Sequence, residues 1–173
     1  MKRLIYFLMI LFCLTVITTH IYAQNVTSEN TTSWYKGQLG SGLENSGPTC
    51  IAMLIERNGP ATTIKQIKAQ LTPKSSDIAS YNELLGVLGS YGIHYEWLKG
   101  MSSWSGEGVV LIIINPRYVP EAPYEYDGGH YILIVDEKDD KYIVNDPLAG
   151  SPTRYYSKDA IKDARYHYII WIP

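Results

Sequence analysis

The chain has 173 residues, of which 46% are hydrophobic, and this is enough for one domain with a sizeable core. Its 15 basic and 17 acidic side chains are nearly balanced and form no basic stripe, which argues against nucleic acid as a partner. The two cysteines and four histidines show no paired ligand spacing, and there is no phosphate-binding glycine motif. We therefore expect neither a metal site nor a cofactor.

Residues 1–23 carry the features typical of a secretory signal peptide. Lys2-Arg3 precede an apolar run over 4–17, and Ala23 provides a small residue at the end. This run is shorter than the roughly 20 apolar residues of a membrane span. We therefore expect export to the periplasm or the outside of the cell. The alternative is an uncleaved N-terminal anchor, and only then would the chain be held at a membrane.

The remainder divides into a flexible polar linker over 24–33 and one domain over 34–173. In the first half of this domain, apolar residues recur at helical spacing, which predicts helices over about 47–57 and 63–71 and a third from Ser80 that ends at Gly89 or Gly92. Ser80 and Glu83 form a capping-box pattern, and Asn58-Gly59 is a typical helix end.

In the second half the apolar pattern changes to that of a sheet. The sequence predicts strands over 93–98, 109–114, 130–135, 142–145 and 166–172, with a short helix over 158–164 capped by Ser157. A long proline-containing loop is expected over 115–127, near the strand that begins at His130. Helices followed by an antiparallel sheet are typical of an α+β fold.

Three segments carry candidate chemistry. Ser46 directly precedes the Gly-Pro pair that opens the first helix, where free N–H groups and the helix dipole favour a negatively charged atom. His130 follows two glycines and opens a strongly apolar strand, and Asp146 follows on the next strand in an Asn-Asp-Pro sequence. A nucleophile at a helix start, a histidine on a strand and a carboxylate on the next strand are the arrangement of a papain-like hydrolase.

With these segments the chain resembles the C39 and C39-like cysteine peptidases. Their motifs read Cys-Gly-Pro-Ala/Thr-Ser/Cys-Leu-Ala-Met, Gly-His and Asn-Asp-Pro, and the resemblance covers most of residues 38–172. It implies a papain-like α+β fold in which a helical N-terminal half packs on an antiparallel sheet. It also implies that His130 is the general base, that Asp146 orients it, and that Gln38 is the oxyanion-hole donor. The position of the catalytic cysteine is occupied by Ser46.

Each of these residues has an alternative interpretation. Ser46 is either a silent helix N-cap or a serine nucleophile that depends on His130, unless the motif is aligned wrongly. Cys50, one helical turn further along, is either a core residue or a replacement nucleophile. His130 alone could be structural and Asp146 a turn-former. Gln38 lies eight residues before Ser46, a longer gap than the family has, so it could instead be an exposed loop residue.

The sequence leaves three functions open. The first is a degenerate pseudopeptidase that binds a peptide or protein segment without cleaving it. The second is an active peptidase that uses Ser46, or Cys50, with His130 and Asp146. The third is a structural or interaction protein in which the site is a remnant. Fold resemblance does not separate them, because function depends on the site.

Overall fold

The computed structural model describes residues 33–38, 45–71, 80–125 and 127–173. The predicted signal peptide over 1–23 and nearly all of the predicted linker over 24–33 lie outside the described residues. Within the described ranges, no helix is both long and apolar enough to cross a membrane.

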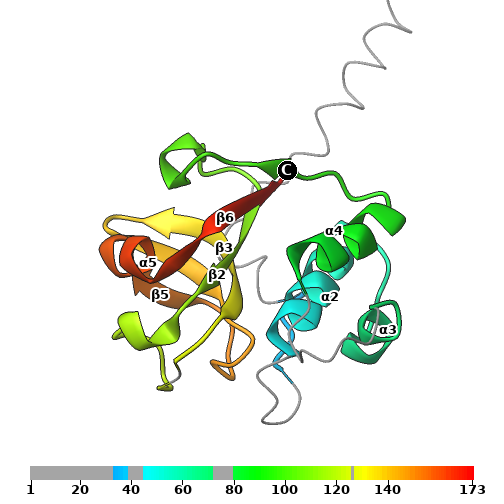
Figure 1. The fold of residues 1–173 in the computed structure, drawn as a ribbon, viewed down its shortest axis with the longest axis horizontal. Coiled ribbons are helices and arrows are strands. Elements are labelled where there is room, and N and C mark those ends of the chain that lie inside the picture. Colours follow the sequence, from blue (N-terminus) through cyan, green and yellow to red (C-terminus); the bar gives the residue numbers. More distant parts are fainter. Residues whose placement is uncertain (1–32, 39–44, 72–79, 126) are drawn as a thin grey trace, which may run out of the picture.

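Helices form one side of the domain (Figure 1). They are α2 (Ser46–Asn58), α3 (Ile64–Lys68) and α4 (Tyr81–Ser90). The predicted capping box at Ser80 is confirmed, since its side chain accepts from the Glu83 N–H and the Glu83 carboxylate accepts from the Ser80 N–H. Gly59 follows α2 with a positive φ of 154°, which a residue without a Cβ adopts readily. The helix predicted over 63–71 is shorter than expected, and Thr63 caps it.

An antiparallel sheet forms the other side, with strand order β1-β6-β2-β3-β4-β5 (Figure 1). Its strands are β1 (Glu96–Trp97), β2 (Val109–Ile114), β3 (His130–Lys138), β4 (Lys141–Asn145), β5 (Arg154–Ser157) and β6 (Arg165–Ile172). Short 3-10 helices η2 (Met101–Ser103) and η3 (Pro116–Tyr118) lie in the connections, and α5 (Lys158–Ala164) begins after its predicted cap, Ser157. The helical half and the antiparallel sheet confirm the predicted α+β class.

One predicted strand needs correction, and one strand was missed. The first strand, expected over 93–98, is only two residues long, because only Glu96 and Trp97 pair with β6 at the sheet edge. Strand β5 was not predicted. Its four residues pair with β4, but they contain no apolar run and one of them, Tyr155, is exposed.

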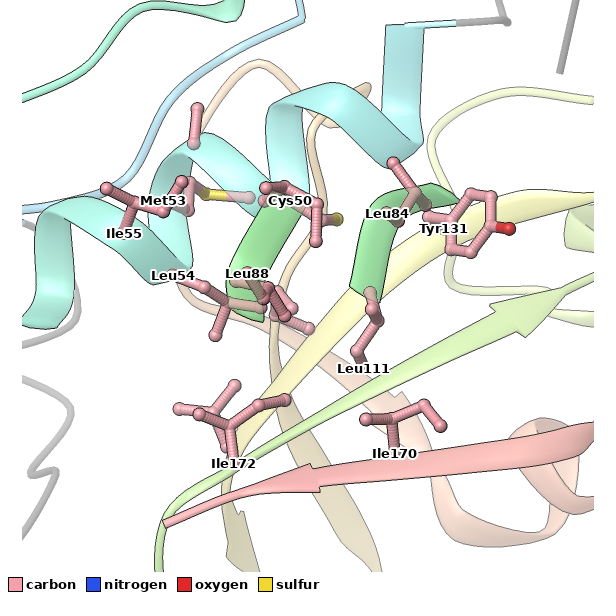
Figure 2. Close-up of a cluster of buried hydrophobic side chains, with 14 of the residues drawn as sticks. Cys50, Met53, Leu54, Ile55, Leu84, Leu88, Leu111, Tyr131, Ile170 and Ile172 are labelled. Carbon is pink, nitrogen blue, oxygen red and sulfur yellow. The ribbon is translucent and has the colours of Figure 1, made fainter. Parts of the chain in front are cut away.

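Both faces of the central strand β2, and of the first six residues of β3, are buried. Alternate residues of β2 and β3, such as Leu111 and Tyr131, pack against α2 and α4 in the core shown in Figure 2. The residues between them, such as Ile112 and Ile132, belong to a second cluster that includes Ile161 of α5. This double burial explains why β2 and β3 read as continuous apolar runs.

Gly47 marks the close approach of α2 to α4 and β3. A Cβ at this position would lie 2.9 Å from Leu84 Cδ1 and 3.1 Å from a ring carbon of Tyr131. We expect Gly47→Ala to lower the free energy of unfolding by ~1–3 kcal/mol, measured by urea denaturation, because overpacking displaces these neighbours. Gly86→Ala is the control, since nothing lies within 4 Å of its added Cβ in the exposed part of α4. Equal stability of the two variants would contradict this account.

Candidate active site

Ser46 is the first residue of α2, and it is buried with 2% of its surface exposed. Its Oγ accepts a hydrogen bond from the backbone N–H of Tyr131 at 3.2 Å, so the hydroxyl lies next to the start of β3. The interpretation of Ser46 as the helix N-cap is therefore wrong: the cap position is Asn45. The Ser46 hydroxyl takes part in a tertiary contact instead of a local cap, because β3 lies close enough to α2 for the Tyr131 N–H to donate to it.

His130 and Asp146 form a buried pair at the adjacent end of the sheet. The distance from His130 Nε2 to Asp146 Oδ1 is 2.8 Å, and neither side chain is exposed. Strand β3 pairs with β4 so that Leu133 lies opposite Asn145, and the next residue, Asp146, leaves the sheet toward the beginning of β3. The expected meeting of these two side chains across a hairpin is thus present.

Four donors surround the Asp146 carboxylate. Oδ1 accepts from His130 Nε2 and from the backbone N–H of Leu148 at 2.9 Å. Oδ2 accepts from the hydroxyls of Tyr124 and Tyr156, at 2.5 and 2.7 Å. Burial alone would raise the pKa of this carboxyl, but the hydrogen bond and charge of His130, with the tyrosine hydrogen bonds, outweigh burial and lower it. Asp146 is therefore ionised at neutral pH.

This arrangement determines the tautomer of a neutral His130 ring. Because an ionised carboxylate only accepts hydrogen bonds, the proton between the pair belongs to Nε2. Nδ1 is then the unprotonated nitrogen, and within the described part of the chain this buried atom has no hydrogen-bond partner. The pair therefore has the polarity of a general base oriented by a carboxylate.

The predicted loop over 115–127 contributes directly to this site. The Tyr124 ring packs edge-on against the His130 ring, with centroids 5.5 Å apart, while its hydroxyl reaches Asp146. Tyr124 also lines a partly open cavity of about 550 Å³. The remaining walls of this cavity come from the same loop and include Arg117, Val119 and Asp127.

The other candidate residues lie as follows. Gln38 is half-buried rather than exposed, and its backbone N–H donates to the Pro147 carbonyl at 2.8 Å, which places it beside Asp146. The segment 39–44 between Gln38 and Ser46 lies outside the described residues. Cys50 is fully buried in the core (Figure 2). Burial, and then the negative charge of Asp146, raises the pKa of its thiol well above the ordinary value, which argues against Cys50 as a nucleophile.

Three tyrosines of this site were missed by sequence reasoning. Tyr124 and Tyr156 donate to the Asp146 carboxylate, and the Tyr35 hydroxyl donates to the Asp146 carbonyl at 3.0 Å. The one available signal was the abundance of tyrosine, with 15 in the chain. No spacing distinguishes these three from the rest. Among the described residues, no group of three or more His, Cys, Asp or Glu side chains could hold a metal ion.

Comparison with known proteins gives the family. The sequence model of the Peptidase C39 family matches residues 39–171. The chain belongs to this family. Among curated proteins, none matches this C39 chain.

Solved structures of C39 peptidase domains share the fold. The peptidase domain of Streptococcus ComA, a bifunctional ABC transporter of a quorum-sensing pathway, has a TM-score of 0.62 at 12% identity, covering 80% of this chain and 96% of that one. A double-glycine-motif protease from an AMS/PCAT transporter, solved with the leader peptide, has a TM-score of 0.62 at 14% sequence identity. The match covers 80% of this chain and 89% of that one. A C39-like peptidase from Bacillus anthracis has a TM-score of 0.61 at 14% sequence identity, and the match covers 80% of this chain and 93% of that one. The predicted papain-like architecture is confirmed.

Proposed function

We propose that this C39 protein is an exported pseudopeptidase that binds a peptide or protein segment without cleaving it. The proposal rests on aligning Ser46, the first residue of α2, with the cysteine of the family motif. Its Oγ accepts from the Tyr131 N–H, which supports its place beside the start of β3. A serine hydroxyl is far less acidic than a thiol and forms no resting ion pair with an imidazole. Export rests on the sequence of residues 1–23.

Two features favour retained binding. The buried His130–Asp146 pair keeps its full set of hydrogen bonds on the carboxylate, and the adjacent loop forms a partly open pocket lined by Tyr124. A buried carboxylate is costly to maintain unless its oxygens are satisfied, and here both oxygens of Asp146 accept hydrogen bonds. The C39 protease from the AMS/PCAT transporter was solved with a leader peptide, which supports a peptide as the class of ligand.

One observation favours the second candidate, an active serine hydrolase. In the neutral ring, Nδ1 of His130 is the basic nitrogen, and it has no hydrogen-bond partner among the described residues. Such a nitrogen could take the proton of a nucleophile that moved within reach when substrate binds. Ser46 would then be that nucleophile and Gln38 the oxyanion-hole donor. The binding experiment below separates the two candidates.

The test uses the full chain and a library of fluorescein-labelled short peptides, with binding followed by polarisation and cleavage by mass spectrometry. We expect binding without cleavage, and we expect Ser46→Ala to keep the affinity. Gly129→Leu should weaken binding at least ~10-fold, because Gly129 precedes His130 and an added Cβ already lies 3.3 Å from Ile113 Cγ2. Gly89→Leu is the control, since its Cβ would meet nothing within 4 Å.

Two results would overturn the proposal. Cleavage that disappears with Ser46→Ala and with His130→Ala would establish a serine hydrolase. Absence of binding to every peptide would leave a structural protein with a remnant site, and binding indifferent to Gly129→Leu would place the peptide away from this site.

A further inference from the structure

We propose that Tyr124 and Tyr156 are positioning residues of this site: together they hold the Asp146 carboxylate in the orientation that fixes the His130 imidazole. This inference rests on the proposed function and extends it to residues outside the family motifs. Tyr124 comes from the loop over 115–127 and Tyr156 from strand β5. The two hydroxyls reach the carboxylate from separate elements of the chain.

The argument begins with the two oxygens of Asp146. Both tyrosine hydroxyls donate to Oδ2, at 2.5 and 2.7 Å, while His130 Nε2 and the Leu148 N–H occupy Oδ1. A carboxylate offers about four acceptor sites, so these donors fill it. A rotation of the carboxylate would break several charge-assisted hydrogen bonds at once. Oδ1 therefore stays directed at Nε2.

The protonation states of the tyrosines support this role. Burial, and then the charge of Asp146, raises the pKa of both Tyr124 and Tyr156, so both hydroxyls remain protonated donors. The Asp146 charge also acts on Tyr35 and Cys50, whose pKa values are raised mainly by burial, and Arg154 adds a positive charge near Tyr156. None of these replaces the two hydroxyls on Oδ2.

Tyr124 adds a second constraint that Tyr156 does not. Its ring contacts the His130 ring edge-on, and it also lines the 550 Å³ cavity. The same side chain thus touches both members of the buried pair and lines the cavity formed by the loop. A change in the loop would be transmitted to the imidazole through this residue.

The test reads the imidazole directly in the full natural chain, by ¹⁵N NMR of the histidine rings, with His130→Gln used to assign the His130 signals. We expect the natural chain to show one tautomer with the proton on Nε2. The variant Tyr124→Phe with Tyr156→Phe should show a mixture of tautomers. It should also raise the pH at which the Asp146 carboxyl titrates, followed by ¹³C NMR, by about one unit, since hydrogen bonds to the charged form are lost.

Tyr81→Phe is the matched control, because the Tyr81 hydroxyl is also partly buried and donates to the Tyr168 carbonyl at 3.0 Å, away from Asp146. It should leave both signals unchanged. If the double variant does not fold, Tyr124→Phe alone carries the test, because its ring can still pack against His130. A single Nε2–H tautomer and an unmoved Asp146 titration in the tyrosine variants would overturn the inference. Neither readout requires a bound peptide, so a failure of the proposed function would be seen separately.

Discussion

Asp146→Ala is expected to lower the free energy of unfolding at pH 7 by ~3–5 kcal/mol, because it removes the shared acceptor of a buried hydrogen-bond network. The change leaves His130 Nε2, two tyrosine hydroxyls and the Leu148 N–H without their acceptor in a site closed to solvent. Each buried donor that loses its acceptor adds a desolvation penalty. Urea denaturation of the natural chain and the variant measures the difference.

Asp127→Ala is the control for this variant. Asp127 also accepts two side-chain hydrogen bonds, from Asn115 and Arg117, both at 2.9 Å, but it is exposed. Exposed ion pairs contribute little to stability, so this variant should unfold almost as the natural chain does. If Asp146→Ala were equally mild, the buried network would not contribute to the stability of the fold.

The same carboxylate gives a defined pH dependence. The pKa of Asp146 in the folded chain is lower than in the unfolded chain, so the unfolded chain binds the extra proton first. Its contribution to stability is therefore fully present above the ordinary pKa of about 3.9 and is lost as the pH falls through the folded value. The free energy of unfolding of the Asp146→Asn variant should differ most from that of the natural chain at neutral pH, and this difference should shrink on acidification. A difference independent of pH would contradict this.

Much of the fold could be predicted because local patterns and tertiary structure agree. The capping box at Ser80 begins α4, and Gly59 ends α2. Both act through contacts within a few residues, which a sequence pattern reveals directly. Strands β2 and β3 are apolar because both of their faces are covered. Strand β5 has no such pattern: it is a short strand that exists through its pairing with β4.

The candidate site was predictable only where residues are close in sequence or lie in a family motif. His130 and Asp146 are 16 positions apart, a spacing that fits one hairpin, and the two side chains do meet. The hydrogen bond from the Tyr131 N–H to Ser46 joins residues 85 apart, and no local pattern encodes it. Tyr124 and Tyr156 reach Asp146 through a loop and an unpredicted strand, so their role depends on the tertiary fold.

A cysteine in place of Ser46, the proposed nucleophile position, is expected to be strongly acidic. The full chain would carry Ser46→Cys, with Cys13→Ala and Cys50→Ala so that one thiol remains. A thiol at the start of α2, near His130, should titrate well below the ordinary value of about 8.5, in the range of ~4–7 seen at helix termini beside imidazolium groups. The ultraviolet absorbance of the thiolate, measured against pH, reports this midpoint without requiring a reagent to enter the buried site.

This titration, made with and without His130→Ala, tests most directly the claim that the site is complete apart from its nucleophile. Our account predicts a midpoint below pH 7 that rises by one unit or more, ~10-fold in the ionisation constant, when His130 is removed. An ordinary thiol with a midpoint near 8.5, indifferent to His130, would contradict it. The chain would then carry the C39 fold without an assembled site.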